Sequence, residues 1–374
     1  MAGIYIHIPF CKQACYYCDF HFSTNVNTKT ELIDAILKEI VLRRDYVECE
    51  EIETIYFGGG TPTLLSAKEL ELILNQLRNI FAVKKEVEIT IEANPDDLNK
   101  TYLRALKKVG FNRLSIGIQS FNDRLLKFFN RAHDSNAAKE AVLLARQAGF
   151  ENISIDLIFG VPDQSLDDLK TDLRLALELS IPHISIYGLT IEEDTVFGKW
   201  EKTKKLQPIE EELAAEHLEC IMTTLQAHNY SQYEISNFSL PAAQSKHNSS
   251  YWKSKKYLGI GPAAHSYNQT SRQFNIAHNT KYINAIKSGI VPFEEEILSQ
   301  TDQINETIMV QIRLIEGISL SNLQERFGFD LTEEKSKYLS NYLFQEMIEI
   351  KNEHLVLTEK GKLLADFITE NLII

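Results

Sequence analysis

The chain has 374 residues, 44% hydrophobic and 24% charged, a composition typical of an ordinary globular protein with one large domain and a smaller one. Lys and Arg number 39 against 52 Asp and Glu, and the formal net charge of −13 disfavours nucleic acid and anionic membrane surfaces as partners. No apolar run approaches the length of a membrane span, and the start, MAGIYIHIPFC, lacks the basic region and cleavage site of a signal peptide, so we expect a cytoplasmic protein.

Short β-branched or aromatic runs alternate with helical patterns over the first half of the chain. The expected strands are residues 3–10, 54–60, 86–95, 113–120, 152–162 and 183–190. Between them, residues 29–44, 67–81, 101–110, 136–150 and 166–179 carry apolar side chains at the spacing of a helix. Six consecutive β-α units predict an α/β fold with right-handed crossovers, a partial (β/α)6 TIM-like barrel with an open side.

Polar and glycine residues stand where the expected strands end, which is where the chemistry of such barrels gathers. Each residue alone has a structural explanation, because GGGTP could form a tight turn and Gln119 could be a structural hydrogen-bonding group. Together, five strand ends that face one mouth predict a binding site. The residues concerned are Cys11, Gly58, Gly59, Gly60, Thr61, Pro62, Glu92, Asn94, Gln119 and Asp156.

Cys11, Cys15 and Cys18 follow the first strand at C-x3-C-x2-C spacing. Five cysteines, three of them clustered, do not form a disulfide framework. One interpretation is structural zinc, with His21 as the fourth ligand. The other is an iron–sulfur cluster held by three thiolates, which leaves one iron open to a small molecule. We favour the cluster, because a large barrel has a stable core without a zinc staple.

The other two cysteines, Cys49 and Cys220, lie at the end of one helical pattern and within another. We expect both to be small buried apolar residues rather than functional thiols.

The chain divides at residues 1–230, 231–298 and 299–374. For the middle region, the simpler interpretation is a layer against the open side of the barrel, with Tyr251 and Trp252 as anchors. A functional interpretation notes HNSSYW, with His247 and Asn248, and His265 further on. An imidazole can ligate haem iron and aromatic rings suit a porphyrin plane, but the residues alone favour the packing layer.

Residues 299–374 predict an α+β winged-helix-like domain, with a helix near 304–314, then the segment 317–328, a helix near 333–348 and a short hairpin at 349–368. Such domains often bind DNA. Residues 301–374 carry 7 Lys or Arg and 13 Asp or Glu, so we expect a docking module and no nucleic acid.

The motifs resemble the radical S-adenosylmethionine superfamily, through C-x3-C-x2-C after the first strand and GGGTP after the second. The likeness is strong over residues 3–200. YIHIPFC, FGGGTPT, IEANP, IGIQSFND, NRAHD, IDLIFGVP and HNSSYW resemble the oxygen-independent coproporphyrinogen III oxidase-like subfamily, and within it the HemW-type haem chaperones.

The resemblance implies a [4Fe-4S] cluster on Cys11, Cys15 and Cys18, with S-adenosylmethionine chelating the fourth iron. It places Tyr5 and Tyr17 near the cluster and cofactor, and the backbone of Gly59, Gly60 and Thr61 against the methionine part. It also raises His247 to a candidate haem-site residue. The residues implied for the amino, carboxylate and ribose groups of the cofactor are Glu92, Gln119, Arg131 and Asp156.

Two departures separate this sequence from the porphyrinogen dehydrogenases that it resembles. Phe20 stands where those enzymes have a fourth cysteine, and the position of Cys11 leaves no room for their N-terminal extension. Both departures match the HemW type. We therefore expect a haem chaperone that delivers haem to an acceptor haemoprotein, with respiratory, membrane-associated proteins as candidates. The alternative is coproporphyrinogen III dehydrogenase; productive cleavage of the cofactor and a homodimer are left open.

Overall fold

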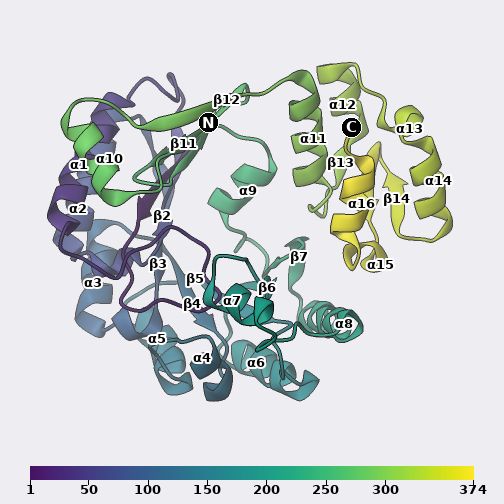
Figure 1. Ribbon diagram of the computed structural model, residues 1–374, viewed down its shortest axis with the longest axis horizontal. Coiled ribbons are helices and arrows are strands. Elements are labelled where there is room, and N and C mark those ends of the chain that lie inside the picture. The colour runs from purple at the N-terminus through teal and green to yellow at the C-terminus, as the bar shows by residue number, and fades with distance from the viewer.

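The computed structural model describes residues 1–374. Its main body is built on one 12-stranded sheet in the order β12-β11-β10-β9-β1-β2-β3-β4-β5-β6-β8-β7 (Figure 1). The first six strands pair in parallel and in chain order, as the sequence predicted. The strands are β1 (Ala2–Ile8), β2 (Ile52–Gly59), β3 (Val83–Ala93), β4 (Arg113–Gln119), β5 (Asn152–Phe159), β6 (His183–Gly188), β7 (Ser231–Glu234), β8 (Asn237–Ser239), β9 (Tyr257–Ile260), β10 (His265–Tyr267), β11 (Ser271–Asn275) and β12 (Phe293–Ile297).

Helices between the strands cover the outer face of the sheet, as Figure 1 shows for the left and lower parts of the molecule. Their buried stripes pack on the strands in one continuous apolar core, in which Ile6, Phe57 and Ile155 are fully buried. The helices of the main body are α1 (Lys29–Leu42), α2 (Ala67–Ile80), α3 (Lys100–Val109), α4 (Asp123–Phe128), α5 (Ser135–Gln147), α6 (Leu166–Glu178), α7 (Val196–Lys202), α8 (Glu211–Ala227), α9 (Lys246–Trp252) and α10 (Asn279–Lys287), with short turns η1 (Pro62–Leu64) and η2 (Pro95–Asp97).

The sheet stays open, because β12 and β7 form its two edges and do not pair with each other. Residues 231–297 extend it at both ends: β8 pairs with β6 in an antiparallel sense, and β9 pairs with β1 in parallel. The expected separate layer is therefore partly a continuation of the sheet. Among the helices of this region, α9 is the one that packs against β1 and β2. The chain division at 230 and 298 stays a prediction.

The C-terminal part has the predicted winged-helix-like arrangement, with its own apolar core and a three-stranded sheet. The hairpin is shorter than expected, because Thr358 accepts a hydrogen bond from the Gly361 amide at 3.1 Å and starts a helix there. The elements are α11 (Gln300–Gln311), β13 (Ile318–Ser319), α12 (Leu320–Phe327), α13 (Leu331–Glu334), α14 (Ser336–Phe344), β14 (Ile348–Lys351), β15 (His354–Leu357), α15 (Glu359–Lys362) and α16 (Ala365–Leu372).

Arg313 joins the C-terminal part to the main body. Its carbonyl accepts from the Ile235 amide at 3.2 Å, and its guanidinium Nε donates to the buried Glu234 at 3.3 Å. The guanidinium also pairs with Asp366 at 3.2 Å and lies 5.6 Å from the ring centre of Trp252 on α9. Because three groups contact the side chain of Arg313 and a fourth contacts its carbonyl, α9 and the C-terminal helices meet at this residue.

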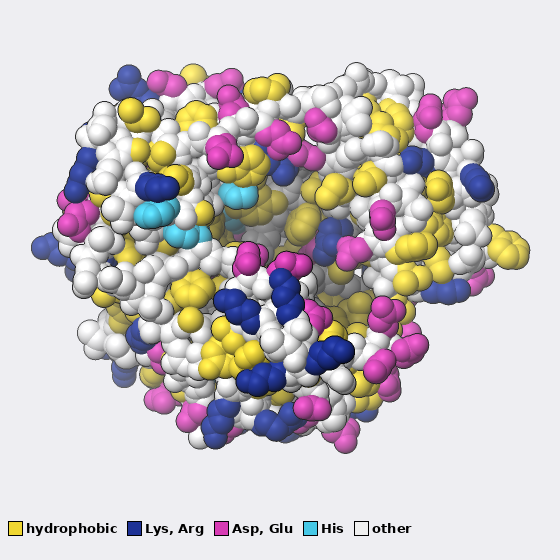
Figure 2. All heavy atoms as spheres, in the orientation of Figure 1, with side chains coloured by type: hydrophobic (Ala, Val, Ile, Leu, Met, Phe, Trp, Pro, Cys, Tyr) yellow, Lys and Arg dark blue, Asp and Glu magenta, His cyan; other side chains and the backbone are white.

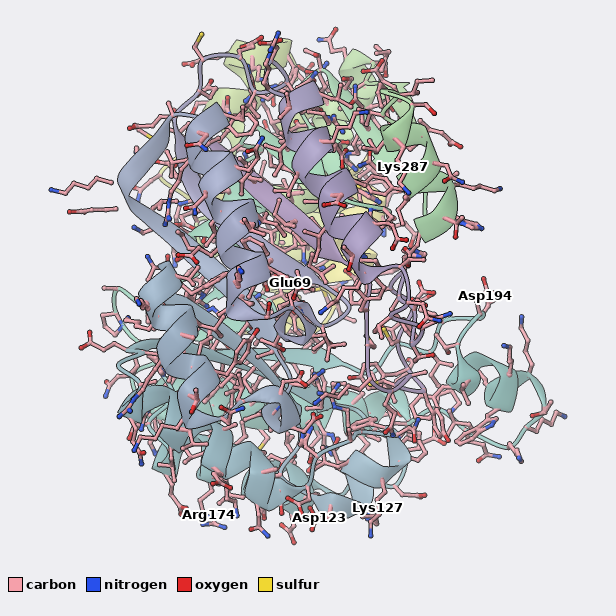
Figure 3. The ribbon with its side chains drawn as sticks, turned by 90° about the vertical axis from the view of Figure 1, so that its left-hand side faces the viewer. Glu69, Asp123, Lys127, Arg174, Asp194 and Lys287 are labelled. Atoms are coloured by element: carbon pink, nitrogen blue, oxygen red, sulfur yellow. The ribbon has the colours of Figure 1, made fainter.

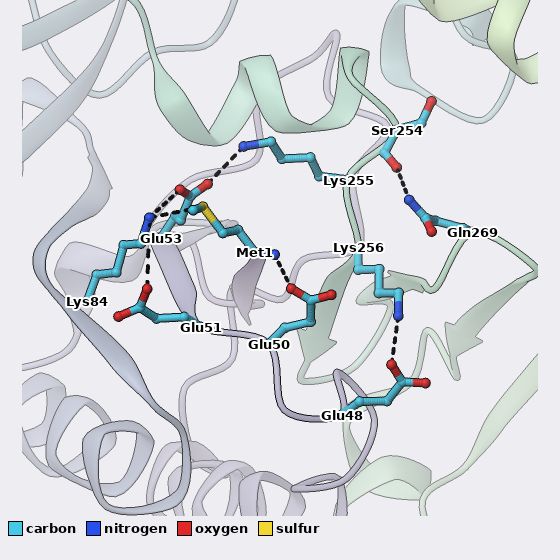
Figure 4. Close-up of polar contacts among 10 residues, drawn as sticks. All are labelled: Met1, Glu48, Glu50, Glu51, Glu53, Lys84, Ser254, Lys255, Lys256 and Gln269. Carbon is cyan, nitrogen blue, oxygen red and sulfur yellow. Dashed lines mark hydrogen bonds and ion pairs between the residues drawn. The ribbon is translucent and has the colours of Figure 1, made fainter. Parts of the chain in front are cut away.

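Ion pairs tie the chain after α9 to the start of β2 (Figure 4). Glu53 on β2 accepts from Lys84 at 2.6 Å and from Lys255 at 2.8 Å, and Lys256 donates to Glu48 at 2.9 Å. Each exposed pair is worth only about 0–1 kcal/mol. Together they connect the segment between α9 and β9 to β2 and to the loop before it.

The two cysteines outside the cysteine loop differ in exposure. Cys49 is exposed in the turn after α1, so the expectation that it is buried is wrong. Cys220 on α8 is partly buried and packs against the core. In the turned view of Figure 3, α1 and α2 cross the face of the molecule, and Asp194 lies on the segment before α7 that projects to one side. None of the helices is both long and apolar enough to cross a membrane.

Candidate functional site

A cavity of about 590 Å³ lies where the parallel strands end, bounded on one side by the cysteine loop. Figure 2 shows that the molecule is hollowed in the middle of this face, between the main body and the C-terminal part. Tyr5, Gly58, Pro62 and His247 lie outside the lining of the cavity. The predicted residues that line it are Cys11, Cys15, Tyr17, Cys18, Gly59, Gly60, Thr61, Glu92, Asn94, Gln119, Arg131 and Asp156.

The cysteine loop leaves β1 and returns on itself, since the Ser23 amide donates to the Pro9 carbonyl at 2.7 Å. All its thiols are free and partly buried. Burial raises the pKa of the Cys11 thiol to about 11 and that of Cys18 to about 12. At neutral pH both groups are therefore protonated thiols. A bound metal centre would supply the positive charge that converts them to thiolates.

The zinc interpretation required His21 beside the cysteines. Its Nε2 is instead 2.8 Å from the Asn279 side-chain oxygen, and its ring faces that of His7 with centroids 6.2 Å apart. His21 does not line the cavity, and no three His, Cys, Asp or Glu side chains are close enough together to hold one metal ion. The structure therefore holds no assembled four-ligand zinc site. The three thiols instead line the cavity.

Arg131 is held at one end of the cavity. Its guanidinium donates to the Cys15 sulfur at 3.3 Å and to the Gly117 carbonyl at 2.6 Å, and it also bonds Asn94. Its Nε is buried without a partner. An unpaired buried donor beside a cavity is costly unless a ligand satisfies it, and a guanidinium suits a carboxylate.

Two acids stand on the same wall, Glu92 on β3 and Asp156 on β5, with β4 between the two strands. Tyr56 donates to Glu92 at 2.7 Å, and burial, followed by the nearby Asp156, raises the pKa of Glu92 to about 8. Burial raises the pKa of Asp156 to about 6, although hydrogen bonds from Ser185 and Ser115 oppose the rise. Both carboxyl groups would gain from a bound ammonium or from donating hydroxyls.

Gly59 and Gly60 owe their identity to packing within the chain. Gly59 has φ +107°, and a Cβ there would lie 2.6 Å from the His7 ring; at Gly60 it would lie 2.7 Å from the Phe10 carbonyl oxygen. The end of β2 thus lies directly against the start of the cysteine loop. This reason for the glycines differs from the expected approach to a ligand, although both residues line the cavity.

Other predicted residues support or border the cavity. Gln119 has φ 69°, a left-handed conformation that costs energy for a non-glycine residue and is typical of functional sites. Tyr5 lies behind the wall of the cavity. Its hydroxyl oxygen is 3.1 Å from His7 Nδ1, and its ring stacks on that of Tyr56. Phe20 lines the cavity and is 72% exposed.

His247 is a buried part of the wall, 2% exposed. Its Nδ1 is 2.7 Å from Thr54 Oγ1 and its Nε2 is 2.8 Å from the Tyr251 hydroxyl, while its ring stacks on Tyr56 at 4.9 Å. Burial lowers the pKa of its imidazole to about 3. Both nitrogens are therefore occupied, and only the next residue, Asn248, lines the cavity. His265 lies on the surface, with its ring edge-on to Phe274.

Sequence reasoning missed four polar residues inside the strands that line the cavity, namely Tyr56, Ser115, Ser185 and Tyr187. Ser115 lies beside Glu92, and Ser185 beside Asp156, in the register of the sheet. Since alternate residues of a strand share a face, counting back by two from the predicted strand ends could have found Tyr56.

Comparison with known proteins assigns the family. The model of the radical SAM superfamily matches residues 5–176, and that of the HemN C-terminal domain matches residues 298–364. The heme chaperone HemW of Lactococcus lactis is 34% identical over 370 residues, which is 99% of this chain and 97% of that protein. The heme chaperone HemW of Bacillus subtilis is 35% identical, over 98% of this chain and 97% of that protein. The chain belongs to the HemW family.

The fold has a solved counterpart. The structure of coproporphyrinogen III oxidase (HemN) from Escherichia coli matches this HemW-family chain with a TM-score of 0.86 at 22% identity, over 100% of this chain and 90% of that one. The likeness confirms the predicted radical SAM fold, with its partial barrel and C-terminal domain.

Proposed function

We propose that this protein is a haem chaperone, which binds haem and, with a [4Fe-4S] cluster and S-adenosylmethionine, delivers haem to haemoproteins. The observation that carries the proposal is that three free thiols share one cavity with Arg131, Glu92 and Asp156. Full-length similarity to proteins named as heme chaperones supports the same function.

The residues present suit the two cofactors. Cys11, Cys15 and Cys18 would hold the cluster, which supplies an iron open to the amino and carboxylate groups of S-adenosylmethionine. Arg131 lines the cavity, and its guanidinium suits the carboxylate of that cofactor. Glu92 and Asp156 have the chemistry for its ammonium and ribose hydroxyls.

The other predicted contacts come from the surrounding walls. Gln119 at the end of β4 and Thr61 after β2 offer hydrogen bonds, and Tyr17 lines the cavity within the cysteine loop. The backbone of Gly59 and Gly60 borders the same space.

His247 remains a candidate haem-site residue, and a role as the iron ligand would require one of its ring nitrogens to exchange Thr54 or Tyr251 for iron. We further propose an acceptor haemoprotein as partner, with respiratory, membrane-associated proteins as candidates. The protein would act in the cytoplasm, without nucleic acid, and a homodimer is an arrangement to be tested.

The decisive experiment mixes anaerobically reconstituted protein separately with haem and with coproporphyrinogen III. We expect a shifted Soret band with haem and no protoporphyrinogen from the second mixture. Conversion of coproporphyrinogen that depends on S-adenosylmethionine would overturn the chaperone proposal in favour of the dehydrogenase. A Soret shift that persists in His247→Ala would reject only that residue as the ligand.

A further inference from the structure

Helix α9, which carries HNSSYW, reaches the cavity through one residue. Every other residue that lines the cavity belongs to the chain up to Glu192, and Asn248 is the single contribution from beyond it. The region after the barrel therefore touches the candidate cofactor site at one side chain.

The amide of Asn248 is free to bind a ligand. It is half-buried, and no hydrogen bond to another side chain or to the backbone engages it; only its main-chain N–H is used, donating to Ser245 at 3.3 Å. A side-chain amide offers two donors and an acceptor. Placed in a cavity wall without internal partners, these groups are available to whatever fills the cavity.

The neighbouring His247 holds α9 in place. Its two ring nitrogens are tied to Thr54 on β2 and to Tyr251 one turn later on α9. Glu88 on β3 accepts from the main-chain N–H of His247 at 3.0 Å and from that of Lys246 at 3.2 Å. These contacts bind the first turn of α9 to two strands, so they fix where the next side chain points.

The same helix is linked to the acid end of the cavity. The His247 ring stacks on Tyr56, with 20° between the two planes, and the Tyr56 hydroxyl donates to Glu92. A shift of α9 would therefore disturb both Asn248 and the orientation of Glu92.

We propose that Asn248 is the residue through which the HNSSYW helix contacts a ligand, and that His247 is a positioning residue for it. The inference rests on the proposed function, because it needs a ligand in this cavity. The ligand would place a hydrogen-bonding oxygen or nitrogen atom next to the Asn248 side chain in the cavity. S-adenosylmethionine and haem both carry such atoms, so separate titrations distinguish them.

The first test compares Asn248→Ala with Ser249→Ala, a matched control on the same helix whose side chain neither lines the cavity nor makes a hydrogen bond. Anaerobically reconstituted full-length protein is titrated with S-adenosylmethionine by calorimetry and with haem by the Soret band. We expect Asn248→Ala to bind one of the two about tenfold more weakly, the loss of roughly one ligand hydrogen bond. The control should keep both affinities, and both variants should keep the wild-type melting temperature.

The second test separates positioning from general stability. We expect His247→Phe to weaken the same ligand, and this weakening to disappear when Asn248 is already Ala, because the two residues act in series. The same weakening in both backgrounds, whether from a merely structural role or from direct ligation of haem by His247, would overturn the positioning role. Thr54→Val, which removes one of the two ring contacts, gives the same cycle if His247→Phe does not fold.

The outcomes separate this inference from the function on which it rests. Wild-type protein that binds neither ligand would reject both. Wild-type protein that binds its ligands, together with Asn248→Ala at unchanged affinity for both, would reject the role of Asn248 and leave the chaperone proposal standing.

Discussion

Replacement of His247 by Phe should destabilise the fold, and the loss should be larger at pH 7 than at pH 5. Phe keeps an aromatic ring to stack on Tyr56 but removes both ring hydrogen bonds. Thr54 Oγ1 and the Tyr251 hydroxyl would then be left without these partners beside a residue that is 2% exposed. Leaving a buried polar group unpaired costs about 1–3 kcal/mol, so we expect a loss of roughly 3 kcal/mol at pH 7.

The pH dependence follows from the His247 imidazole. Burial lowers its pKa from 6.5 to about 3. The imidazole is therefore protonated below pH 6.5 in the unfolded chain, but only below about pH 3 in the folded chain. The stability that neutral His247 contributes is present above pH 6.5 and is lost as the pH falls through this window. Between pH 7 and pH 5 the wild type should lose roughly 2 kcal/mol from this group, which Phe cannot lose. The difference between wild type and variant should therefore shrink to about 1 kcal/mol at pH 5.

Urea unfolding at the two pH values measures both numbers, with m-values compared to check that the same transition is followed. Thr54→Val is the matched control, because it removes one hydrogen bond and leaves the imidazole to titrate. Its loss should therefore change much less with pH. An equal loss for His247→Phe at pH 7 and pH 5 would refute the reasoning, since the imidazole would then be protonated, or open to water, in the folded protein.

Three further predictions concern the cluster, the cofactor and the junction between the two parts. Changing the three loop cysteines to Ser should abolish bound iron and sulfide in anaerobically prepared protein while Cys220→Ser keeps them; stoichiometric zinc in the wild type would contradict the cluster. Glu92→Gln should weaken S-adenosylmethionine binding by about 1–3 kcal/mol in calorimetry, and unchanged affinity would count against its place at the cofactor. Arg313→Met should speed proteolytic separation of the C-terminal part relative to Lys337→Met, an exposed change in the same part; equal rates would show that Arg313 does not hold the junction.

The repeating β-α order was predictable because each unit buries a continuous apolar strand and one face of an amphipathic helix, and both leave a local pattern. The additions to the sheet were not, because β7 to β12 are short and partly polar, and their places depend on partners far away in the chain. Glu39 shows the difficulty. On α1 it looks like a surface charge, yet it is fully buried and accepts from the Gly261 amide at 2.8 Å and the Asn275 side chain at 2.7 Å.

Topology alone brings several of the candidate site residues together. Strand ends of a parallel sheet meet at one edge, so Glu92, Gln119 and Asp156 could be placed in one mouth before any geometry was known. The side chains whose polar atoms are occupied by hydrogen bonds within the cavity wall could not be predicted from topology. The two nitrogens of His247 find Thr54 and Tyr251 only after β2 and α9 have packed together.

This division of roles bears on how haem and S-adenosylmethionine could influence each other. Iron at His247 Nε2 would displace the Tyr251 hydroxyl, and iron at Nδ1 would displace Thr54, so either bond would loosen the contacts that hold α9. The same ring stacks on Tyr56, which orients Glu92, and precedes Asn248 in the cavity wall. Ligation by His247 would therefore change the affinity for S-adenosylmethionine, and by thermodynamic reciprocity the cofactor would change the affinity for haem by the same factor. If haem is instead bound away from α9, the two affinities should be independent, and titrating each ligand in the presence of the other decides between these arrangements.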